Sequence, residues 1–188
     1  MTKSLIVCGI FAIFQQLTGL NAITFYASQI FESNDDPNDI SQGIKITLIT
    51  SSVNLGFTII STFFIDKFGR KPLLVVGYCI MIIFMFLTGL FEYLDKTIYE
   101  QVSVMIYIAG FAISMGPILW AYLPEVLNSA GLGLASVLNW AFVIVISLVV
   151  PQLAKLDSGM FFVFTGTNVA GFLFMLFFIV ESKGRSRA

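Results

Sequence analysis

The residues best suited to chemistry are amides near the start of the chain. Gln15, Gln16 and Asn21 lie in a stretch that otherwise has the composition of a membrane-spanning helix. A carboxamide that faces lipid finds no hydrogen-bond partner, so these groups should point toward other helices, water or a ligand. Gln15 and Asn21 do not share one face of a regular helix, but a bend at Gly19 would aim both at one cavity. Because a neutral amide both donates and accepts, the cluster favours a neutral, polyhydroxylated ligand over a bare cation or a dicarboxylate.

A second interruption follows about a hundred residues later. Gly116 and Pro117 lie inside another apolar run, where proline removes a backbone hydrogen bond and bends the helix. The indole of Trp120 can stack on the apolar face of a sugar ring. The alternative for this interruption is a kink that only serves packing. For the isolated amides within apolar runs the alternative is a hydrogen bond that joins two helices; these residues are Asn54, Asn139 and Asn168.

The composition of the chain indicates the environment that surrounds these residues. The chain has 188 residues, of which 57% are hydrophobic and only 11% charged, and its mean hydropathy is +0.93. A soluble domain is about half apolar and about a quarter charged, so this chain cannot cover a water-facing surface. Six apolar runs are long enough to span a bilayer; they cover residues 5–31, 44–65, 72–93, 98–123, 132–153 and 159–180. We therefore predict one all-α, polytopic membrane domain over residues 1–188. Since the first and fourth runs are interrupted, two three-helix inverted repeats are expected.

The distribution of lysine and arginine predicts the orientation. One side of the predicted bundle carries seven basic residues and the other carries three, namely Lys45, Lys96 and Lys155. Because cytoplasmic loops carry the excess of positive charge, the seven-residue side should be cytoplasmic, with both termini inside. The acidic stretch 32–39 is then a solvated external loop, and no metal site is assigned to it.

Several classes of function are disfavoured. The net charge is −1 and the chain has no histidine, so neither a nucleic-acid surface nor a histidine metal site is expected. Cys8 and Cys79 each lie alone in an apolar run and are interpreted as packing residues. No catalytic constellation or phosphate-binding loop is evident, so we expect no enzyme activity and no cofactor. Charged residues lie at or near the ends of the runs, with Glu125 the nearest exception, which argues against an ion relay within these helices.

Five motifs together resemble the second half of a sugar porter of the major facilitator superfamily. The stretch from Gln15 to Asn21 resembles the signature of the seventh helix, and the stretch from Asp66 to Lys71 resembles the loop after the eighth. The segment from Gly116 to Trp120, followed by Pro124 and Glu125, is similar to the tenth helix and its end. The remaining two matches are Asn139-Trp140 in the eleventh helix and 181–185 after the twelfth.

This resemblance implies roles for particular residues. Sugar binding would fall to Gln15, Gln16, Asn21, Asn54, Trp120 and Asn139. Gating would involve Phe25 and Tyr26, which match the mobile outer part of the seventh helix, together with Gly116 and Pro117. A cytoplasmic charge network would contain Asp66, Arg70, Glu125, Glu181 and Arg185. Ala112 stands where many family members carry a hydrogen-bonding side chain, so one sugar contact is expected to be missing.

The resemblance implies a six-helix half of a facilitative hexose transporter in the plasma membrane. It would work by alternating access against an N-terminal six-helix half or a second copy, and alone it should transport negligibly. With four or five hydrogen bonds of ~1 kcal/mol each, less the cost of ordering, affinity should be on the order of millimolar. Two alternatives stay open. One is a truncated, non-transporting partner or regulator of a full-length carrier. The other is a transporter of another polyol or small neutral solute, with or without proton coupling.

Overall fold

A computed structural model describes residues 2–31 and 40–181, with side chains described for all of these except 2, 26–31, 40–43 and 46. The acidic stretch 32–39 and Arg185 lie outside the described residues, so the predictions made for them stay predictions.

Helices account for nearly all of the described residues, and no strand occurs among them. Six segments are long and apolar enough to cross a membrane, as the composition predicted. The first and fourth of these segments each consist of two helices. The helices are α1 Thr2–Leu17, α2 Leu20–Phe31, α3 Ile40–Phe68, α4 Arg70–Tyr93, α5 Thr97–Ile113, α6 Met115–Val126, α7 Ser129–Leu153 and α8 Gly159–Phe178, with a short 3₁₀ turn at Ala154–Leu156 before α8.

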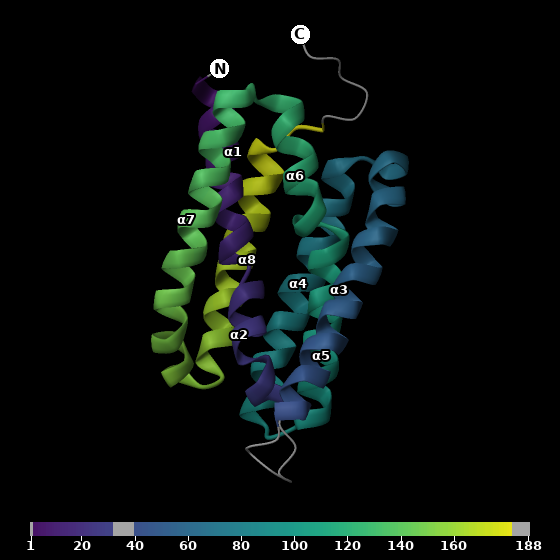
Figure 1. Ribbon diagram of the computed structural model, residues 1–188, viewed down its shortest axis with the longest axis vertical. Coiled ribbons are helices and arrows are strands. Elements are labelled where there is room, and N and C mark those ends of the chain that lie inside the picture. Colours follow the sequence, from purple (N-terminus) through teal and green to yellow (C-terminus); the bar gives the residue numbers. More distant parts are fainter. Residues whose placement is uncertain (1, 32–39, 182–188) are drawn as a thin grey trace.

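The spans run alternately up and down in one bundle. α1 begins and α8 ends at the same end, where α3 also passes into α4 and α6 into α7 (Figure 1). The opposite end holds the α4–α5 and α7–α8 connections. Basic residues 67, 70 and 71 therefore lie at the end of the bundle where α1 begins and α8 ends.

The break in the fourth span lies at Ser114, between α5 and α6. On a continuous helix the N–H of residue 117 would bond to the carbonyl of Ile113, but Pro117 has no N–H. The carbonyl of Ile113 instead accepts a hydrogen bond of 2.6 Å from the hydroxyl of Ser61 on α3. Pro117 thus lies in the first turn of α6, and the interruption it causes falls three residues before it. Both predicted interruptions are present, in the first and fourth spans, while the inverted-repeat relation between the two halves stays a prediction.

Small residues bring α4 and α5 close together beside this break. A Cβ added to Gly77 would lie 1.9 Å from Oγ of Ser114, and one added to Gly110 would lie 2.6 Å from Cγ2 of Ile80. Close backbone approach of this kind is how helices pack without a hydrophobic driving force in lipid. The result is a firm scaffold behind the broken segments, whereas much of α3 and α7 leaves apolar side chains uncovered, among them Leu55, Phe63 and Leu148.

Candidate functional site

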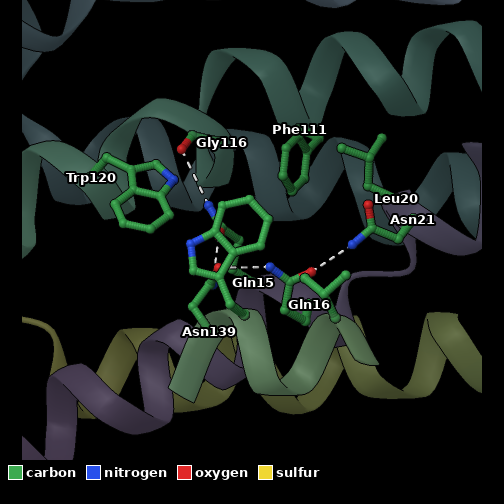
Figure 2. A pocket seen from close by; sticks show the side chains of 10 residues that line it. Gln15, Gln16, Leu20, Asn21, Phe111, Gly116, Trp120 and Asn139 are labelled. Atoms are coloured by element: carbon green, nitrogen blue, oxygen red, sulfur yellow. Dashed lines mark hydrogen bonds between the residues drawn. The ribbon is translucent and has the colours of Figure 1, made fainter. Parts of the chain in front are cut away.

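One pocket of about 340 Å³ brings together Trp120 and four of the five amides predicted to bind a ligand. This volume lies within the ~300–1,000 Å³ typical of small-molecule sites. The pocket lies where the broken spans face α7, and none of its ten lining residues is charged (Figure 2). They are Gln15, Gln16, Leu20, Asn21, Phe111, Gly116, Trp120, Asn139, Trp140 and Val143.

A continuous chain of hydrogen bonds joins the four amides. Nε2 of Gln15 donates to the carbonyls of Met115 and Gly116 at 3.1 and 3.3 Å. Its Oε1 accepts from Nδ2 of Asn139 at 2.8 Å. Oδ1 of Asn139 accepts from Nε2 of Gln16 at 2.9 Å, and Oε1 of Gln16 accepts from Nδ2 of Asn21 at 2.6 Å (Figure 2). The bonds link α1, α2, α6 and α7, so the amides hold the walls of the pocket in register.

The break at Gly19 makes this chain of bonds possible. Residues five apart on a regular helix point about 140° apart around its axis, so Gln16 and Asn21 could not bond to each other on one. Gly19 adopts φ +92°, a conformation that other residues rarely take. A Cβ at Gly19 would also lie 2.7 Å from Cγ of Phe164 on α8. Both the dihedral angle and the close contact therefore require glycine here.

The two indoles form the apolar part of the site. Trp120 is 41% exposed and Trp140 is 63% exposed, although both line the pocket. Phe111 adds a third ring. Flat apolar rings next to amides suit a ligand with an apolar face and polar edges. Since both indoles stand partly uncovered, the described residues form one side of the site.

Four lining residues were not predicted to belong to the site, namely Leu20, Phe111, Trp140 and Val143. Trp140 follows Asn139 directly, and Val143 lies four residues after Asn139 on α7, so helical spacing alone could have added Val143 to the site. Conversely, Asn54 lies on α3 and Pro117 on α6, and neither lines the pocket. Phe25 on α2 is exposed and also lies outside it, while the side chain of Tyr26 is outside the described part of the structure.

Four of the predicted network charges gather at the end of the bundle where α3 meets α4. Arg70 Nη2 lies 2.5 Å from Glu125 Oε1, and its Nη1 lies 3.9 Å from Asp66 Oδ1. The Glu181 carboxylate accepts from the backbone N–H groups of Arg70 and Lys71 at 3.1 and 2.9 Å. It thereby caps the first turn of α4, where an acidic group is favoured. Gly69 leaves room for this carboxylate, because a Cβ there would lie 2.8 Å from Glu181 Oε2.

At the opposite end of the bundle, Glu100 in the first turn of α5 is only 7% exposed. The sequence did not single it out because a carboxylate at a span end is ordinarily solvated. It does not line the pocket. Among the described residues, no group of histidine, cysteine, aspartate and glutamate could hold a metal ion.

Comparison with known proteins identifies the fold and the family. The family model described as "Sugar (and other) transporter" matches residues 1–187. The chain belongs to this sugar transporter family. Membership of a family of transporters agrees with the prediction that the chain is not an enzyme, and it confirms the resemblance drawn from the motifs.

Individual members of the family are similar along nearly the whole chain. The arabinose-proton symporter of Bacillus subtilis (strain 168) is 33% identical over 99% of this chain and 41% of its own length. The facilitated trehalose transporter Tret1 of Bombyx mori is 35% identical over 93% of this chain and 37% of its own. The chain thus spans about two-fifths of the length of these relatives.

A solved structure of the same family matches the fold. The proton:xylose symporter XylE bound to 6-bromo-6-deoxy-D-glucose, a major facilitator superfamily protein, superimposes with a TM-score of 0.86. The two chains are 31% identical, and the match covers 97% of this chain and 41% of XylE. The chain is therefore an integral, multi-pass membrane protein whose helices form half of a major facilitator fold.

Proposed function

We propose that this chain binds a sugar in the pocket between its broken spans and forms one wall of a hexose carrier. The observation that carries this proposal is the convergence of Gln15, Gln16, Asn21 and Trp120 on one uncharged cavity, with Asn139 behind them. Amides match the hydroxyl groups of a sugar, and the indole matches its apolar face. The relatives are named for arabinose, trehalose and xylose, which supports sugar as the class of ligand.

We infer alternating access as the mechanism. The two breaks lie beside the pocket, and interrupted helices around a central site are the hallmark of carriers that rock about their substrate. The partly uncovered indoles need an opposite wall, which we assign to an N-terminal six-helix half or a second copy of this chain. The Arg70–Glu125 pair and the Glu181 cap would hold the cytoplasmic ends together in the outward-facing state. Gating by Phe25, Tyr26 and the segment at Gly116 and Pro117 belongs to this proposal.

Passive uniport of a hexose is the mode we favour. No charged side chain lines the pocket, so nothing in this wall offers a proton-binding group to the substrate. Two of the relatives are named proton symporters, and coupling of that kind would require a group on the opposite wall. Asn54 would complete the set of sugar contacts from α3, as the family resemblance implies.

The chain carries its own binding probe. It has two tryptophans, and both line the pocket, so intrinsic fluorescence reports on this site alone. Titration of the purified chain with D-glucose should change the emission saturably, with a midpoint on the order of millimolar. D-xylose, D-arabinose, trehalose and inositol, titrated in the same way, rank the ligands, and L-glucose is the control. No saturable change with any of these solutes would contradict sugar binding.

Transport is tested separately from binding. Liposomes that contain only this chain should take up negligible radiolabelled glucose, because one wall cannot alternate access by itself. Uptake should appear when a six-helix N-terminal half of a family member is reconstituted with it. Saturable uptake by monomers of this chain alone would contradict the half-carrier proposal. Binding of a full-length carrier without any sugar-dependent fluorescence change would favour the regulator instead.

A further inference from the structure

The break in the first span leaves backbone carbonyls without helical N–H donors. Side chains from two other spans donate hydrogen bonds to these carbonyls instead. Thr18 O accepts from the hydroxyl of Tyr107 on α5 and from Nδ2 of Asn168 on α8, both at 2.8 Å. Leu17 O accepts from the hydroxyl of Thr167, also on α8, at 2.6 Å. This is the shorter of two acceptor distances for that hydroxyl, since Phe164 O on the same helix lies at 2.9 Å. Within a membrane a carbonyl without a donor is costly, so these contacts decide whether the chain can stay unwound here.

Stability alone does not explain the choice of these side chains. Asn168 is 1% exposed and Tyr107 is fully buried. Oδ1 of Asn168 has no hydrogen-bond partner among the described residues. A buried acceptor without a partner is destabilising, and an apolar residue of similar size would avoid it. What Asn168 adds is a donor aimed at the break, shared between Thr18 O and the carbonyl of Phe164 on its own helix.

The contacts lie between the two parts of the amide chain. Gln16 precedes the break and Asn21 follows it, so the conformation of the break sets the direction in which each amide points. If the donors were removed, Thr18 O would be satisfied most simply by the N–H of Ala22, as in a regular helix. That rewinding would turn Asn21 away from Gln16 by about 140° and break the bond between them.

We propose that Tyr107, Thr167 and Asn168 are positioning residues of the sugar site. None of them lines the pocket; they act by holding the break open so that the amides of Gln16 and Asn21 face the ligand together. This inference rests on the proposed sugar-binding function and adds to it a layer of residues from α5 and α8, behind the pocket.

Matched substitutions on one helix test the proposal. Thr167→Val removes the hydroxyl and keeps the shape. Its control is Thr165→Val, since the Thr165 hydroxyl bonds only to the carbonyl of Phe161 on the same helix. We expect Thr167→Val and Asn168→Leu each to raise the Kd for D-glucose about fivefold, the factor that one net hydrogen bond corresponds to. Thr165→Val should stay within about twofold, and Thr167→Ser should recover most of the affinity that Thr167→Val loses.

The shape of the fluorescence titration separates positioning from folding. A side chain that only stabilises the fold changes the fraction of folded molecules. An irreversible loss lowers the amplitude alone, and a reversible loss raises the apparent Kd only by the reciprocal of the folded fraction, which circular dichroism measures. A positioning residue shifts the midpoint of a fully folded variant. In an Asn21→Ala background, Thr167→Val should shift the midpoint much less than in the unmodified chain, because the amide that it positions is already gone.

Saturable binding by the unmodified chain together with unchanged midpoints in Thr167→Val and Asn168→Leu would overturn the positioning role alone. Equal shifts in Thr165→Val and Thr167→Val would overturn it as well, and so would additive effects with Asn21→Ala. An unmodified chain that shows no saturable change would overturn the proposed function and this inference with it.

Discussion

Asn139 shows how one side chain can organise a site while remaining almost entirely buried. It is 1% exposed, and its Nδ2 donates both to Ala12 O and to Gln15 Oε1. Its Oδ1 accepts from Gln16. Asn139 therefore orients two glutamines at once, while the chain of bonds ends at the more exposed Asn21. Linked amides in a low-dielectric interior strengthen one another, and the loss of one member weakens the rest.

Asn21→Ala should weaken sugar binding about fivefold, because one net hydrogen bond of ~1 kcal/mol is lost and Gln16 Oε1 loses its donor. The midpoint of the tryptophan titration measures this. Gln152→Ala is the matched control, since Gln152 is an exposed amide far along α7 that bonds to Lys155. Equal affinities of Asn21→Ala and the unmodified chain would remove Asn21 from the site.

Arg70 forms ion pairs with two acidic side chains, and the two pairs should contribute unequally to stability. Glu125 lies 2.5 Å away and is one-third exposed, whereas Asp66 lies 3.9 Å away and is largely exposed. Glu125→Gln should lower the free energy of unfolding by about 1 kcal/mol after allowance for solvent screening. Asp66→Asn should change it by less than about 0.5 kcal/mol. Thermal unfolding in detergent, repeated at high salt to screen the pair, measures both. A larger effect of Asp66→Asn would contradict the observed geometry.

Among the elements, the two broken spans place the site. Each break is set by a residue whose backbone chemistry differs from the rest, Gly19 through its positive φ and Pro117 through its missing N–H. Neither residue supplies the donors that satisfy the freed carbonyls. Ser61 on α3 donates to the freed carbonyl of the fourth span. Side chains on α5 and α8 donate to the freed carbonyls of the first span. Thus a local residue type starts each break, and distant helices maintain it.

Gly19→Ala should be strongly destabilising, by about 2 kcal/mol or more, since it combines backbone strain with a clash against Phe164. It should also abolish the sugar-dependent fluorescence change. Gly166→Ala on α8 is the control, because a Cβ there meets nothing within 4 Å, and it should be neutral or slightly stabilising. Thermal unfolding followed by circular dichroism compares the two. A Gly19→Ala variant as stable as Gly166→Ala would contradict the need for glycine at the break.

The molecule as a whole is a bundle with one polar site and wide apolar faces. α3 is the least buried of the six spans, and α7 carries exposed apolar residues along its length, including Val137, Ile144 and Leu148. Lipid or an opposite half can cover such faces. Among the described residues, Lys3, Lys67, Arg70 and Lys71 lie toward one end and Lys45, Lys96 and Lys155 toward the other. This charge asymmetry agrees with the orientation predicted from all the basic residues of the sequence.

Labelling of single cysteines tests this orientation. In a Cys79→Ser background, Lys155→Cys should react with a membrane-impermeant maleimide on intact cells, because the α7–α8 connection is predicted to be external. Asp66→Cys, at the α3–α4 end, should react only after permeabilisation. The reverse pattern would invert the predicted topology. The remaining Cys8 is buried, so it should contribute little to either signal.

Particular residues show which features of the fold and the site could be predicted from the sequence. The spans follow from hydropathy, and the amides Gln15, Gln16 and Asn21 stood out because lipid cannot satisfy them. The breaks were predictable from Gly19 and Pro117. Trp140 was missed, since deciding which face of α7 meets α1 requires the packed bundle, whereas the four-residue spacing from Asn139 could have indicated Val143. The hydrogen-bond partners of Asn139 could not be predicted either, because they lie more than 120 residues away along the chain.

The sequence by itself determined that the chain spans a membrane, where it breaks and which polar groups must seek partners. These properties depend on local composition and on the chemistry of single residues in lipid. Only the tertiary structure decided that the amides bond to one another, that both tryptophans border the same pocket and that Tyr107, Thr167 and Asn168 hold the first break. Those relations join residues far apart in the sequence, and helix packing alone brings them within hydrogen-bond distance.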